Sequence, residues 1–88
     1  MAGDAKVLAE VQRLARLDRI VITGHARIRM VDRGATRKDL RSALVTATIA
    51  IRQVDRGNWR IEGGADNAGD DLTVIVDLEA DVIVVTLF

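Results

Sequence analysis

The amino-acid sequence predicts an α+β domain in which N-terminal helices pack on one face of a four-stranded, mainly antiparallel meander sheet. Apolar residues recur at helical spacing in the first half of the chain, and from Thr48 onward they alternate along strand-like segments. The connections are short, which favours pairing between strands that are neighbours in the sequence. With 88 residues, the chain is expected to form one domain over residues 1–88.

The first predicted helix covers residues 4–17. Its apolar positions fall on one side of the helical wheel, and they are Val7, Leu8, Val11, Leu14 and Ala15. Residues 20–22 follow as a short β-branched run. Because Gly24 comes almost at once, this run is interpreted as a brief extended segment that leads into the next helix.

Two further helices are predicted in close succession. Thr23 is the expected N-cap of a helix over residues 24–33, and Gly34 is its expected C-terminal stop. The third helix covers residues 36–47 and places Asp39 in a capping-box position. The short connection between the two helices predicts a sharp turn of the chain.

Four strands complete the predicted fold. Turn residues separate them, and they cover residues 49–54, 59–61, 72–78 and 82–88. The last two strands are apolar at both odd and even positions, so both of their faces need cover. Helices shield only one face, and the other is therefore expected to bind a second copy of the chain or a protein partner.

The composition excludes several classes of site. There is no cysteine and only one histidine, so neither a disulfide framework nor a zinc or iron site is expected, and we predict no metal or cofactor. Charged residues interrupt the N-terminus, and no segment has the apolar length of a membrane span. These features predict a cytoplasmic protein that does not associate with a membrane.

Charge is distributed unevenly along the chain although the net charge is zero. Residues 1–60 contain all 13 basic residues and six acidic ones, which gives +7, and residues 61–88 carry −7. This asymmetry is consistent with a positive face that binds a polyanion such as RNA. The alternative is that the two halves neutralise each other in the folded molecule.

The strongest chemical candidate is the helix that begins after Thr23. His25 would be its second residue, beside the positive end of the helix dipole, where backbone N–H groups can receive a phosphate. Arg29 and Arg33 recur at intervals of four and share the same side. An imidazole beside guanidinium groups suits RNA cleavage, because it can exchange a proton while the arginines stabilise phosphate charge. A purely structural histidine on a solvated basic helix is the alternative.

Parts of the sequence resemble a known family. The run Ile-x-Ile-Thr-x-His-Ala-x-x-Arg-Met-x-x-Arg-Gly at residues 20–34 is followed by Lys-Asp-Leu-x-x-Ala-Leu at residues 38–44. Together with segments 59–63 and 71–76 and the closing Val-Val-Thr-Leu-Phe, they resemble small bacterial domains of unknown function. That family is grouped with ribonucleases of the RelE, MqsR, barnase and EndoU type.

The resemblance implies a RelE/barnase-like fold and a metal-independent endoribonuclease of a toxin–antitoxin pair. It implies RNA as substrate and a cognate antitoxin as protein partner. The residues that match by position are His25, Arg29 and Thr86 as catalytic groups and Arg33 as a phosphate-binding group, and Arg27 joins them as a candidate RNA contact. The chain departs from the RelE pattern in its neutral charge and in lacking an evident second proton-transfer group.

Two other functions remain open. The domain could be a non-catalytic interaction module that dimerises or binds a partner through its sheet. It could also bind DNA through a helix-turn-helix in which Thr36, Arg37, Lys38 and Arg41 meet the duplex, although strands follow where a third helix would be expected. Trp59 could stack on a base, but a lone tryptophan in a strand is more often core.

Overall fold

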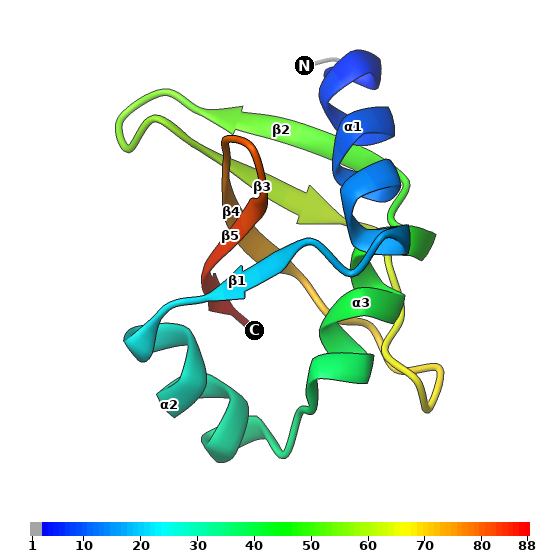
Figure 1. Ribbon diagram of the computed structural model, residues 1–88, viewed down its shortest axis with the longest axis vertical. Helices are drawn as coiled ribbons and strands as arrows, with labels where there is room; N and C mark the ends of the chain where they lie inside the picture. The colour runs from blue at the N-terminus through cyan, green and yellow to red at the C-terminus, as the bar shows by residue number, and fades with distance from the viewer. Residues whose placement is uncertain (1–2) are drawn as a thin grey trace.

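The computed structural model describes residues 3–88 and confirms the α+β class, with three helices and five strands (Figure 1). In chain order the elements are α1 (Ala5–Arg16), β1 (Ile20–Ile22), α2 (Gly24–Arg33), α3 (Arg37–Thr46), β2 (Ile49–Gln53), β3 (Asn58–Glu62), β4 (Val74–Leu78) and β5 (Val82–Leu87). The prediction of a four-stranded sheet is wrong, because the sheet has five strands in the order β1-β5-β4-β3-β2.

The additional strand is β1, the segment predicted to be only a lead into α2. It pairs in parallel with β5, and Ile20 lies opposite Val82. Backbone bonds at its ends, from Val82 N to Arg19 O at 3.0 Å and from Thr23 N to Val84 O at 3.2 Å, fix this register. The other neighbouring strands pair antiparallel, so the sheet is mixed.

The helix boundaries agree closely with the sequence, which predicted caps for α2 and α3 but none for α1. Asp4 begins α1 by accepting hydrogen bonds from the N–H groups of Lys6 and Val7, both at 3.0 Å. Thr36 and Asp39 form the predicted capping box of α3. Gly34 ends α2 in the left-handed region at φ 70°, where a side chain would be strained. Helix α2 has the predicted bounds, and α1 and α3 are each one residue shorter at both ends than predicted.

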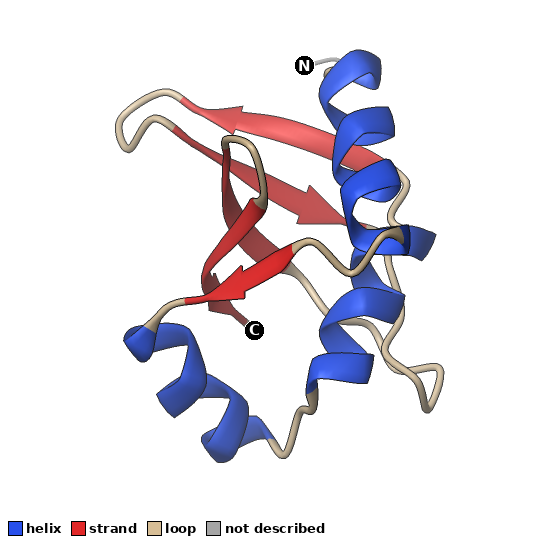
Figure 2. Cartoon of the chain, in the orientation of Figure 1, coloured by secondary structure: helices blue, strands red, loops and turns tan. Residues whose placement is uncertain are grey.

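Helices α1 and α3 lie against each other and against one face of the sheet (Figure 2). The core contains side chains from both helices and from alternate strand positions, and its fully buried members include Leu14, Leu40, Leu44, Ile61, Val74, Val76, Val82, Val84 and Leu87. In contrast, α2 stands at the end of β1, apart from the α1–α3 pair (Figure 1). This core is almost entirely aliphatic, as the composition predicts.

The opposite face of the sheet carries a row of residues in register: Ile51, Arg60, Ile75 and Thr86. Ile75 is only 5% exposed although none of the helices within residues 3–88 covers this face. Nearby, the guanidinium of Arg60 lies over the ring of Phe88, 5.0 Å from its centroid, and pairs with the carboxylate of Glu62. Side chains of the sheet thus provide part of the cover that the apolar strands require.

The loop before β4 is longer than predicted. We expected a strand from Leu72, but β4 begins at Val74. Leu72 is buried, and its N–H donates to the carbonyl of Gly64 at 3.1 Å. Gly64 itself allows the loop to pass close to α3, since a Cβ there would lie 1.9 Å from the carbonyl oxygen of Ala43.

Among residues 3–88, no helix combines the length and apolarity needed to cross a bilayer.

Candidate functional site

Hydrogen bonds between its N-cap and β5 position α2. The hydroxyl of Thr23 accepts from Ala26 N at 3.2 Å, as an N-cap should, and it donates to the carbonyl of Val84 at 2.9 Å. The N–H of Thr23 donates to the same carbonyl. Ala26 is fully buried against the core. The start of α2, and with it His25, is therefore held against the last strand.

His25 is the second residue of α2 and its side chain is exposed. Within residues 3–88 the imidazole makes no hydrogen bond and no ion pair. It stands in the first turn, where backbone N–H groups not used by the helix give a partial positive charge. The ring is thus accessible to a ligand, and this position favours an anionic one.

Arg29 and Arg33 continue the same side of α2 toward its C-terminus. The Nε of Arg29 donates to the carbonyl of Leu87 at 3.4 Å, and Nη2 of Arg33 donates to the carbonyl of Asp71 at 2.7 Å. A guanidinium has five N–H donors, so each arginine keeps most of its donors for a ligand. His25, Arg29 and Arg33 form a stripe, here named the α2 stripe, along the side of α2 that meets β5 and residue 71.

Arg27 does not belong to the α2 stripe. It lines a shallow hollow of about 540 Å³ between α2 and the start of α3, together with Met30, Val31, Gly34, Ala35 and Thr36. Its offset of two residues from His25 turns it toward another side of the helix. The structure therefore places the two predicted RNA-binding arginines, Arg27 and Arg33, on different sides of α2.

The backbone at Thr86 lies near the α2 stripe, because Arg29 binds the next residue, Leu87. The Thr86 side chain, however, lies on the face of the sheet opposite α1 and α3. It is the register partner of Ile75, which alternates with the core residues Val74 and Val76. The next residue, Leu87, supplies the carbonyl that binds Arg29. Among residues 3–88, no hydrogen bond joins the Thr86 hydroxyl to the α2 stripe.

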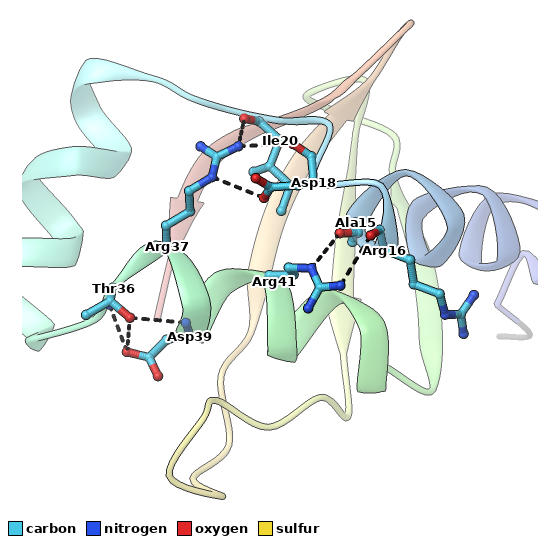
Figure 3. A network of polar contacts seen from close by, with 8 residues as sticks. All are labelled: Ala15, Arg16, Asp18, Ile20, Thr36, Arg37, Asp39 and Arg41. Atoms are coloured by element: carbon cyan, nitrogen blue, oxygen red, sulfur yellow. Dashed lines mark hydrogen bonds and ion pairs between the residues drawn. The ribbon is translucent and has the colours of Figure 1, made fainter.

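Three of the four residues of the predicted helix-turn-helix, all except Lys38, have structural contacts in this fold (Figure 3). Thr36 caps α3. Arg37 donates to the carboxylate of Asp18 at 3.2 Å and to the carbonyl of Ile20 at 2.7 Å. Arg41 reaches back to the last turn of α1. Arg37 and Arg41 thereby fasten α3 to the connection between α1 and β1.

Two carboxylates have altered acidity for local reasons. The pKa of Asp39 is lowered because backbone N–H groups, first that of Thr36 and then that of Asn67, donate to its carboxylate. The pKa of Glu10 is lowered chiefly by the side-chain hydrogen bond from Arg13. Neither carboxylate belongs to the α2 stripe.

Residues 3–88 contain no group of three or more histidine and acidic side chains arranged to hold a metal ion.

Comparisons of the chain with models of protein families, with curated proteins and with solved structures find no match. The geometry of the described residues therefore has to support any functional argument by itself.

Proposed function

We propose that the domain is a toxin-type endoribonuclease that uses side chains of the α2 stripe and no metal. The observation that supports it is an exposed imidazole in the first turn of α2, followed on the same side by two arginines anchored to backbone carbonyls. Anchored guanidinium groups lose less conformational freedom when they bind phosphate. We further propose a cytoplasmic location, RNA as substrate and an antitoxin as protein partner.

In the proposed reaction, His25 accepts the proton of the RNA 2′-hydroxyl as its oxygen attacks the adjacent phosphorus. A bond forms between the 2′-oxygen and phosphorus, and the bond from phosphorus to the 5′-oxygen breaks. Arg29 and Arg33 stabilise the charge that develops on the phosphoryl oxygens. Water protonates the departing 5′-oxygen, which leaves a 2′,3′-cyclic phosphate on one product.

The test is to incubate single-stranded RNA with purified protein in EDTA and to compare wild type with His25→Ala, Arg29→Ala and Arg56→Ala. We expect losses of about 10²–10⁴-fold for His25→Ala and about 10²–10³-fold for Arg29→Ala. Arg56 lies in the exposed turn between β2 and β3, so Arg56→Ala is the control and should cleave like wild type. Identical products and rates from wild type and His25→Ala would refute the proposal.

A second candidate function is that of a non-catalytic interaction module, for which the structure offers a specific observation. Ile28 and Val31 lie one turn apart on the outer side of α2, and they are 63% and 82% exposed. The sheet, where the sequence led us to expect the binding face, leaves Val21 and Phe88 less exposed, at 46% and 42%. A partner that buried Ile28 and Val31 would remove apolar area from water.

This second function is tested by the mass of the protein in solution. A module that self-associates through α2 should be dimeric by light scattering, and Ile28→Ser/Val31→Ser should make it monomeric. Val54→Ser is a matched control, because Val54 is 79% exposed but lies near the distant β2–β3 turn. A wild-type monomer, or a dimer that the double substitution leaves intact, would contradict self-association through α2.

A further inference from the structure

A second group of basic residues lies away from the α2 stripe, where the C-terminal end of α1 meets the first turns of α3 (Figure 3). A hollow of about 610 Å³ lies there, lined by Arg16, Leu17, Asp18, Arg37, Lys38 and Arg41. Four of these six side chains are basic and one is acidic, so the lining carries a net positive charge. We name this hollow and its continuation along α3 the α1–α3 groove.

Two of the four basic side chains are fixed in place by the fold. Arg41 donates from Nε to Ala15 O at 3.1 Å and from Nη2 to Arg16 O at 3.2 Å. Arg37 is held by Asp18 and by the carbonyl of Ile20. Fixed guanidinium groups with remaining donors are prepared for an anion, because little side-chain entropy is left to lose.

The other two, Arg16 and Lys38, make no side-chain hydrogen bond and no ion pair within residues 3–88. Lys38 is the second residue of α3, at the positive end of the helix dipole, where a cation is unfavourable. Arg37 adds another cation to the same turn. Asp39 in the same turn offsets one of these two positive charges, and a bound anion would offset the other.

The groove continues beyond its charged part. A neighbouring hollow of about 320 Å³ shares Lys38 and Arg41 and is otherwise lined by Ser42, Val45, Thr46 and Asn67. None of these four side chains is charged. The α1–α3 groove thus has a cationic part beside a neutral part. In the neutral part Asn67 supplies an amide and Val45 an apolar group, whereas the Ser42 and Thr46 hydroxyls already donate to backbone carbonyls and can only accept. A cationic part beside a neutral part matches the succession of phosphate and nucleoside along an RNA strand.

We propose that the α1–α3 groove binds single-stranded RNA, with phosphates in the cationic part and a nucleoside in the neutral part. The proposal rests on RNA being the substrate of the proposed function, and it assigns a binding site distinct from the α2 stripe. A single strand fits better than a duplex, since the bases of a duplex are stacked and cannot enter a side hollow. Arg16 and Lys38 supply the electrostatic attraction, and Arg37 and Arg41 supply fixed donors.

The experiment measures binding of a labelled single-stranded RNA in the His25→Ala background, in which we expect cleavage to be slowed about 10²–10⁴-fold. It compares Arg16→Glu/Lys38→Glu with Arg52→Glu/Arg56→Glu, a substitution on the β2–β3 hairpin with the same change in net charge. We expect the groove variant to weaken binding at least tenfold and to reduce the slope of log K against log salt by about 1.4, for two lost phosphate contacts. The hairpin variant should keep the slope of the His25→Ala protein.

Equal loss of affinity in the two variants would overturn the proposal, because it would show a response to net charge alone. Unchanged binding in the groove variant would also overturn it. The proposal would also be overturned if the protein bound vesicles of anionic lipid through Arg16 and Lys38 but did not bind RNA. Thermal unfolding controls for folding, and Lys38→Glu alone should raise Tm because it places an acid in the first turn of α3.

Failure of this proposal is distinguishable from failure of the ribonuclease. RNA binding that depends on the groove, in a protein that cleaves nothing, would support the groove and refute the proposed enzyme. Cleavage that depends on His25, with unchanged RNA affinity and KM in the groove variant, would refute the groove and support the enzyme.

Discussion

Helices α2 and α3 each contain ten residues and each begin after a threonine cap, yet they are attached to the domain in different ways. Helix α3 buries Leu40, Ala43 and Leu44 in the core, whereas Ala26 is the only fully buried residue of α2. Burial of a leucine contributes about 1.5–3 kcal/mol, and a typical hydrogen bond contributes about 0.5–1.5 kcal/mol. Apolar burial thus fastens α3, in addition to the hydrogen bonds of Arg37 and Arg41.

Hydrogen bonds to backbone carbonyls are present in both helices, but they form a larger share of the attachment of α2 because α2 buries so little apolar surface. Thr23 binds Val84, Arg29 binds Leu87, and Arg33 binds Asp71. These bonds leave the outer side of α2 exposed to solvent, including Ile28 and Val31. The difference teaches that a helix held by polar anchors can present functional groups without giving its side chains to the core.

The largest expected difference between the helices comes from truncating apolar side chains. Leu44 is fully buried, so Leu44→Ala should lower the free energy of unfolding by about 2–5 kcal/mol. Ile28→Ala on the exposed side of α2 should change it by less than about 0.5 kcal/mol. Urea denaturation of both variants measures the contrast. A larger loss at Ile28 than at Leu44 would mean that α2 is part of the core.

Removing the N-caps should produce a smaller difference between the two helices in the free energy of unfolding. Thr23→Ala removes a cap and the hydrogen bond to Val84, which together are worth about 2 kcal/mol. Thr36→Ala removes the cap of α3 and should cost about 1 kcal/mol. Chemical denaturation gives both values, and Thr23→Ser is the control that keeps the hydroxyl. Equal losses would argue against a contribution from the bond to β5.

The C-terminal stop of α2 offers a third comparison. Gly34→Ala places a side chain at φ 70°, which should cost about 1–2 kcal/mol. Gly24→Ala, at the first position of the same helix, has open space around its Cβ and should be neutral or stabilising by up to about 1 kcal/mol. Opposite shifts in Tm are the expected result. A stable Gly34→Ala variant would show that the end of α2 relaxes easily.

The smallest expected effect is the pH dependence of the α3 cap. Because folding lowers the pKa of Asp39, its contribution to stability is complete above the ordinary aspartate pKa and is lost as pH falls through the folded pKa. Wild type should therefore lose more stability than Asp39→Asn in denaturant titrations carried from neutral pH into this acidic range. Because Asp39 is only partly buried, screening by solvent keeps this change in stability small. Parallel pH profiles for the two proteins would assign the dependence to other groups.

Local signals in the sequence were sufficient for the caps. Thr23, Gly34 and Thr36 were identified from residue type and spacing, and all three act as predicted. The hairpins were also predicted, because turn residues and alternating apolar residues mark them in neighbouring segments. Partners close in sequence are predictable for this reason.

Partners distant in sequence were not predictable. The strand β1 is three residues long, which is too short to show the alternation of apolar and polar residues that marks a strand. Its partner β5 is about 60 residues away in the sequence. The same limit applies to the site. Spacing predicted that His25, Arg29 and Arg33 share a side of α2, but it could not show that carbonyls of Leu87 and Asp71 hold the arginines. Spacing also could not show that Arg16 and Arg41, from two different helices, line the same groove.

The bond from Thr23 to Val84 also orders events in time, since its two residues are 61 positions apart. Closing so long a loop is slower than forming a local helix or hairpin, and β5 leaves the ribosome after the other four strands of this sheet. A nascent chain that ends before β5 has no carbonyl to receive the Thr23 hydroxyl and no Leu87 for Arg29. The α2 stripe and the core, to which β5 contributes Val82, Val84 and Leu87, therefore both require β5, and a chain that ends before β5 does not carry the site in its folded form.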